Sequence, residues 1–137
     1  MLVLDCRQDR GSFIGPAYYD ASEPENVAKC QLGFPSRPGA RAPAGRLRRF
    51  VLVPCSPRTV AIHHRKGEWS YQYCGQGGLS WSIPYAAGVL ALGWQLRPEL
   101  SGTQMRELLF RSAYVDPSGA KFINPPEFIR LVKAIPR

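Results

Sequence analysis

The chain has 137 residues, which is enough for one modest domain or for part of a larger one. Its 13 glycines and 13 prolines indicate a loop-rich chain and exclude a plain helical bundle. No apolar run approaches the roughly 20 residues of a membrane span, so we expect no membrane-spanning segment and no membrane partner. The apolar stretch within the first six residues is too short, and is followed too soon by charged residues, to be a secretory signal. The cellular compartment is therefore not predicted.

The net charge of +8 is concentrated between Arg37 and Lys66, a stretch called the basic window below. One interpretation of this basic window is a surface for nucleic acid or another polyanion. The other is a solvated insertion, because residues 35–45 are rich in Pro, Gly, Ala and Arg and carry little aromatic interleaving for base stacking. We favour the second and predict an Arg/Pro/Gly-rich loop at about 35–49, with nucleic acid not expected as a partner. The window contains no acidic residue, and its basic residues are Arg37, Arg41, Arg46, Arg48, Arg49, Arg58, Arg65 and Lys66.

Short strands are expected in the first half of the chain. Apolar or β-branched runs that end at turn residues favour strands, and Pro54 supplies one clear stop. Further on, Trp69, Tyr71 and Tyr73 alternate with smaller or polar residues, which is the period of a strand. The expected strands are 2–4, 25–32, 50–53 and 59–62, followed by the alternating stretch at 69–74.

A helix is predicted over 81–95 because apolar side chains fall on every side of it, as in a helix that is buried all round. Pro84 is expected in its first turn, where a missing N–H is tolerated. A glycine-rich run, 75–78, precedes it. Ser80 is therefore predicted where a loop meets the positive end of a helix, and backbone N–H groups there can stabilise a developing negative charge.

Two further helices are marked by their start signals. Ser101 with Gln104 forms a capping box, and the apolar stripe that follows predicts a helix ending near Ala113. Pro125 begins a last helix.

The four cysteines are widely spaced: Cys6, Cys30, Cys55 and Cys74. No Cys-x-x-Cys pair is present, so a zinc site with His63 and His64 is poorly supported. A disulfide framework is possible but not implied, and isolated buried thiols are the simpler interpretation. We expect no metal and no cofactor.

One stretch carries a family resemblance. Gly78, Ser80, Pro84, Ala87 and Gly88 match in register the motif Gly-Thr-Ser-Met-Ala-x-Pro-x-x-Ala-Gly, which holds the nucleophile of the subtilisin-like serine peptidases (subtilases). Leu79, Trp81, Ser82 and Tyr85 depart from it. Residues 97–109 and 122–125 resemble segments that follow the motif in that family.

The resemblance implies an α/β fold, namely the C-terminal half of the three-layer subtilisin-like fold. That half comprises a few strands, a buried nucleophile helix and two further helices in a single partial domain over 1–137. It also implies a serine endopeptidase that hydrolyses peptide bonds, with Ser80 as the nucleophile of an Asp-His-Ser triad and a peptide or protein as substrate.

The family's catalytic Asp and His both precede the serine, and this chain shows neither in its family context. His63 and His64 are the only histidines, and they follow no His-Gly-Thr pattern; an exposed position on a strand or loop is the simpler expectation for both. The chain is therefore expected to be a fragment that lacks both groups, with the missing N-terminal half as its partner and with part of its central helix uncovered. Alternatives are a catalytically inactive relative kept for binding or assembly, and a basic nucleic-acid-binding module.

Overall fold

A computed structural model describes residues 13–20, 22–23, 26, 29, 31–32, 50–55, 58–74 and 77–136. These residues form a mixed α/β structure with three helices and two sheets. The strand predicted at 2–4 and the loop predicted at about 35–49 lie outside the described residues. In chain order the elements are β1 (Ile14–Tyr18), β2 (Gln31–Leu32), β3 (Val51–Pro54), β4 (Arg58–Arg65), β5 (Glu68–Cys74), α2 (Leu79–Leu96), α3 (Gly102–Ser112), β6 (Tyr114–Val115), β7 (Lys121–Phe122) and α4 (Pro125–Lys133).

The larger sheet has the strand order β2-β1-β3-β7-β6. Strands β1, β3 and β7 are parallel, and the outer strands β2 and β6 run antiparallel to their neighbours. Leu52 at the centre of β3 pairs with Gly15 on one side and with Phe122 on the other. All four residues of β3 are buried, as expected of a parallel strand that is covered on both faces. The strand predicted at 50–53 is confirmed with a shift of one residue. Of the stretch predicted at 25–32, the structure describes 26, 29, 31 and 32, and of these Gln31 and Leu32 form β2.

Strand β1 was not predicted, because Gly15 and Pro16 interrupt its apolar pattern. Both residues fit their places. A Cβ added to Gly15 would lie 2.8 Å from Cδ2 of Leu52, so the small residue allows the two strands to approach. Strand β2 pairs with Ala17 and Tyr18 and does not reach Pro16. In the described sheet, β1 is therefore paired on one side only at Pro16, and a missing N–H is tolerated there.

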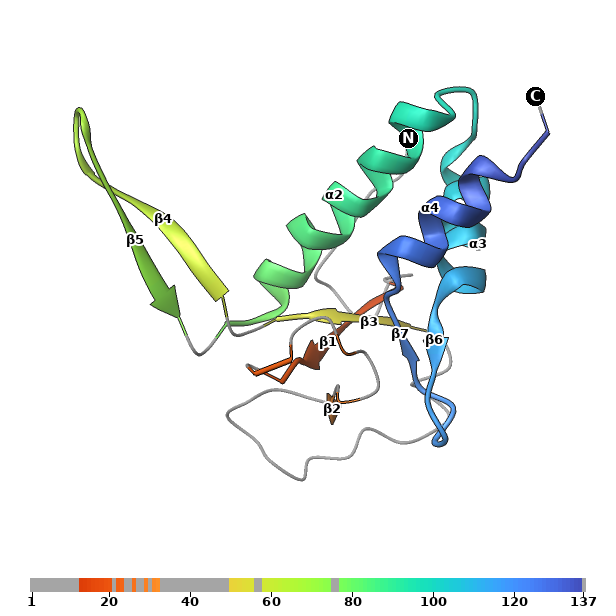
Figure 1. Cartoon of the computed structure of the whole chain (residues 1–137), viewed down its shortest axis with the longest axis horizontal. Helices are drawn as coiled ribbons and strands as arrows, with labels where there is room; N and C mark the ends of the chain where they lie inside the picture. The colour runs from red at the N-terminus through yellow and green to blue at the C-terminus, as the bar shows by residue number, and fades with distance from the viewer. Residues whose placement is uncertain are drawn as a thin grey trace.

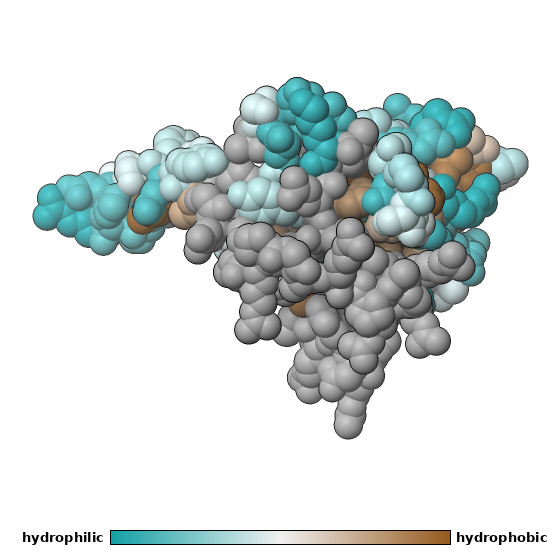
Figure 2. Space-filling view, turned by 90° about the horizontal axis from the view of Figure 1, so that it is seen from below, coloured by the Kyte–Doolittle hydropathy of each residue, from teal (hydrophilic) through white to brown (hydrophobic). Residues whose placement is uncertain are grey.

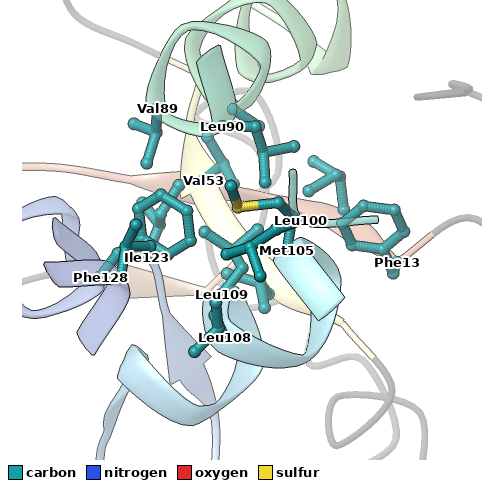
Figure 3. Close-up of a cluster of buried hydrophobic side chains, with 14 residues drawn as sticks. Phe13, Val53, Val89, Leu90, Leu100, Met105, Leu108, Leu109, Ile123 and Phe128 are labelled. Atoms are coloured by element: carbon teal, nitrogen blue, oxygen red, sulfur yellow. The ribbon is translucent and has the colours of Figure 1, made fainter. Parts of the chain in front are cut away.

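The three helices lie on one face of the larger sheet (Figure 1). Helix α2 packs on β1 and β3, and α4 packs on both α2 and α3. Figure 3 shows the main core between helices and sheet, where Val53 of β3 meets Leu90, Met105, Leu109 and Phe128. A smaller cluster, formed by Ala17, Tyr19, Leu52, Ala120 and Phe122, is also buried.

The starts of α3 and α4 follow from local hydrogen bonds. The Ser101 hydroxyl accepts from the Gln104 backbone N–H at 3.3 Å, and the Gln104 side chain accepts from the Ser101 N–H at 2.8 Å. The predicted capping box is thus confirmed, and α3 ends at Ser112 as expected. Helix α4 begins at Pro125, as predicted. In its first turn, the hydrogen bond from Arg130 lowers the pKa of the Glu127 carboxyl.

Helix α2 differs from its prediction in two ways. Its first residue is Leu79 rather than Trp81, which puts Pro84 at the sixth position, in the second turn rather than the first. The prediction of a helix buried on all sides is also wrong: Leu92 is 49% exposed and Leu96 41% exposed. The sheet and the other two helices contact one side only, and the residues that this side buries are Ser82, Ala86, Val89, Leu90 and Gly93.

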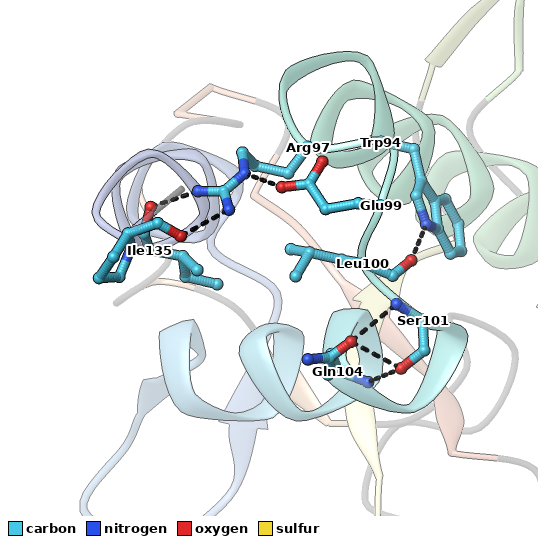
Figure 4. Close-up of polar contacts among 8 residues, drawn as sticks. Trp94, Arg97, Glu99, Leu100, Ser101, Gln104 and Ile135 are labelled. Carbon is cyan, nitrogen blue, oxygen red and sulfur yellow. Dashed lines mark hydrogen bonds and ion pairs between the residues drawn. The ribbon is translucent and has the colours of Figure 1, made fainter.

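The buried Arg97 connects the turn after α2 to the residues that follow α4 (Figure 4). Its guanidinium donates to the carbonyl oxygens of Ile135 and, at 2.7 Å, Pro136, and it also pairs with the Glu99 carboxylate. A guanidinium suits this place because its fixed fork of donors reaches several acceptors at once.

Replacing Arg97 with alanine is expected to lower the free energy of unfolding by about 2–3 kcal/mol, because charge-assisted hydrogen bonds are lost from a buried site. Arg97→Lys is expected to restore only part of this, since an ammonium cannot span the same acceptors. Urea unfolding of the full chain measures both. The exposed Arg111→Ala serves as the matched control and should stay within about 0.5 kcal/mol. Equal losses for Arg97→Ala and Arg111→Ala would contradict the assignment.

Candidate active site at the start of helix α2

Ser80 is the second residue of α2, and its side chain is exposed. The N-cap, Gly78, is extended and provides no side-chain hydrogen bond to the helix, and the first turn contains no acidic residue. The Ser80 hydroxyl makes no hydrogen bond with any residue that the structure describes. The positive end of α2 is thus not neutralised by its own side chains, and an exposed hydroxyl stands beside it.

Ser82 anchors the first turn of α2 to the sheet. It is fully buried, and its hydroxyl lies 3.0 Å from the Val53 carbonyl oxygen and 3.2 Å from that of Pro54, so it donates to the end of β3. Ser80 lies two residues earlier, on the opposite side of the turn. This role of Ser82 was not predicted, because a serine in a first helical turn gives no sequence signal for a buried anchor.

The chain that enters α2 is also held closely against β3. A Cβ built on Gly77 would lie 2.0 Å from the Cys55 carbonyl oxygen and 2.5 Å from the Trp81 ring. Cys55 is itself fixed, because its backbone N–H donates to the Ala17 carbonyl oxygen at 2.9 Å. Together, Gly77 and Ser82 determine where α2 begins relative to the end of β3, and hence where the Ser80 hydroxyl points.

The strands predicted at 59–62 and 69–74 are confirmed, and they form the hairpin β4–β5, which turns at Gly67 with a φ of 84°. Figures 1 and 2 show this hairpin extending away from the rest of the described residues. His63 and His64 lie next to its turn and are both exposed, as expected. The His63 ring stacks on Trp69 with centroids 4.4 Å apart, and Nε2 of His64 is 2.6 Å from the Ser70 hydroxyl. The structure therefore does not bring either histidine to Ser80, which lies beyond the other end of the hairpin.

The two cysteines in the described part of the chain form no disulfide with a described residue, and the Cys55 thiol donates to the Ala17 carbonyl oxygen at 3.1 Å. Cys55 is buried, as predicted, and Cys74 is half-buried; Cys6 and Cys30 lie outside the described residues. In the described ranges, no three His, Cys, Asp or Glu side chains gather closely enough to hold a metal ion. Likewise, no described helix combines the length and the apolar character needed to cross a membrane.

Comparison of the chain with models of known protein families, with curated proteins and with solved structures gives no match.

Proposed function

We propose that Ser80 is the nucleophile of a subtilisin-like serine endopeptidase centre, and that this chain forms the C-terminal half of that domain. The observation that carries the proposal is the position of Ser80: exposed, at an uncapped helix N-terminus, within the motif that resembles the subtilases. The parallel strands β1, β3 and β7 beneath the helices support the broader α/β class to which the proposed fold belongs.

The proposed chemistry is acyl transfer. The Ser80 oxygen attacks the carbonyl carbon of a peptide bond while a base removes the hydroxyl proton. The carbonyl oxygen becomes negatively charged, and N–H groups at the start of α2 can donate to it. Collapse of this intermediate breaks the C–N bond, and the leaving amine takes up the proton from the base. Water then releases the acyl group by the same steps.

The base that removes the Ser80 proton has to come from a group other than His63 and His64. Both histidines of the chain lie near the far end of the hairpin. We therefore propose that a second polypeptide segment, corresponding to the N-terminal half of the peptidase domain, supplies the histidine and the aspartate and covers the exposed side of α2.

The lack of a histidine near Ser80 also favours a second candidate. On that alternative the chain is an inactive relative of the peptidases that serves in binding or assembly. The two candidates differ in whether Ser80 lies in a site that stabilises an attacking oxygen once a base is present.

Chemical labelling separates the two candidates. The full chain is incubated with an alkyl fluorophosphonate, with and without imidazole as an external base, and the adducts are located by mass spectrometry of peptides. Ser80 should react about tenfold or more faster than the exposed serines Ser101 and Ser118, because their hydroxyls donate hydrogen bonds to the side chains of Gln104 and Asp116, whereas the Ser80 hydroxyl makes no hydrogen bond with a described residue. Imidazole should accelerate the reaction at Ser80.

Variants complete the test. Ser80→Ala should abolish the preferred adduct, whereas Ser101→Ala should leave it intact. His63→Ala and His64→Ala should leave the rate unchanged, since neither ring is near Ser80. If Ser80 reacts no faster than Ser101 and Ser118 in imidazole, the nucleophile assignment fails and the inactive relative is the better description.

A further inference from the structure

One face of the hairpin β4–β5 presents a row of exposed aromatic rings. Trp69, Tyr71 and Tyr73 are 69%, 82% and 61% exposed, values that are unusual for side chains of this size. They lie on the same face of β5 because successive side chains of a strand alternate between faces. The cross-strand partners of these residues on β4 are His63, Ala61 and Thr59. This set of six residues is called the aromatic face below.

The spacing of the rings is regular. Alternate residues of a strand are about 6.6–7 Å apart, since the rise is about 3.3–3.4 Å per residue. Stacked bases of one nucleic-acid strand are about 3.4 Å apart. A single strand that is drawn out to twice this spacing can thus place one base on each ring. Ala61, opposite Tyr71, is too small to cover the middle ring.

The charge around the aromatic face is basic. Arg65 and Lys66 lie at the turn, and the only acidic residue between 58 and 74 is Glu68. The Glu68 carboxylate is paired with Arg65, whereas Lys66 has no ion pair with a described residue. The whole chain carries a net charge of +8. A second copy of the chain would meet this face with charge of the same sign, whereas a polyanion is attracted to it.

We propose that the aromatic face binds single-stranded nucleic acid, with bases stacked on Trp69, Tyr71 and Tyr73 and with Lys66, at the turn of the hairpin, near the phosphates. Stacking rings in a line beside basic residues form the binding surface of proteins that hold single strands without sequence preference. The basic stretch 35–49 contains no aromatic residue and is not part of the proposed site. It does not depend on the role of Ser80.

The test uses the full chain and fluorescein-labelled oligo-dT of about 12 nucleotides, within the site size of such binders. Fluorescence anisotropy is followed as protein is added at several salt concentrations. Binding is expected at low salt and should weaken as salt rises. The double variant Trp69→Ala/Tyr71→Ala should bind at least tenfold more weakly, since two stacked bases are lost. It keeps every charge of the chain, so a loss of affinity reports the rings and not the net charge.

Gln72→Ala, on the opposite face of β5, is the matched control and should bind as the parent does. Circular dichroism spectra confirm that the variants remain folded, which is expected because the removed rings are exposed. The proposal is overturned if oligo-dT does not bind at low salt, or if the double variant binds as well as the parent. It is also overturned if the rings are required only for binding to anionic phospholipid vesicles, or only for self-association in sedimentation, without oligonucleotide binding.

Discussion

Replacing Phe128 with alanine is expected to lower the free energy of unfolding by about 3–5 kcal/mol. The side chain is fully buried in the core between the helices and the sheet. Its ring lies against the backbone of α2 at Gly93, where an added Cβ would be 2.8 Å from Cζ of Phe128 and 3.1 Å from Sδ of Met105. Removal of the ring leaves a cavity at the point where α2 and α4 meet, and rigid helices cannot close it fully.

Urea unfolding followed by circular dichroism measures this loss. Phe110→Ala is the matched control, because Phe110 is only half-buried at the edge of the same core and its replacement should cost clearly less. Phe128→Leu should recover much of the stability, since it refills most of the volume. If Phe128→Ala and Phe110→Ala have equal midpoints, the packing of α4 on α2 at Gly93 is not as described.

Replacing Gly77 with alanine is expected to destabilise the chain by about 3 kcal/mol, at the upper end of the cost of overpacking. The added methyl group would lie 2.0 Å from the Cys55 carbonyl oxygen, which is a backbone atom held by the sheet. Either the end of β3 or the start of α2 must move. Because Ser80 lies three residues later, the same substitution should also slow its reaction with the fluorophosphonate.

Gly88→Ala is a control for which the change in stability is expected to have the opposite sign. Apart from the nearby backbone of α2 itself, no described atom lies within 4 Å of a Cβ at Gly88, so the substitution should stabilise α2 by about 0.5–1 kcal/mol through helix propensity. Urea unfolding gives both values. A Gly77→Ala chain that is as stable as the parent would show that the loop before α2 is not packed on Cys55.

Elements with strong local signals could be predicted from the sequence. The Ser101–Gln104 pair and Pro125 gave the starts of α3 and α4, since a capping box and a proline at a helix start act within a few residues. Alternation at Trp69, Tyr71 and Tyr73 gave β5. Strand β1 could not be predicted, because Gly15 and Pro16 disfavour a strand locally and are accommodated only by the neighbours that β1 finds in the sheet.

The sequence by itself determined that Ser80 stands where a glycine-rich run passes into a helix. Only the tertiary structure decided which side of α2 is covered, that Ser82 anchors its first turn to β3, and that the rings of β5 face solvent. The physical reason is the distance along the chain over which each interaction acts. Helix starts and strand alternation depend on backbone geometry and hydrogen bonds between near neighbours, whereas burial depends on which distant segments pack against an element, and the composition of the element does not record this.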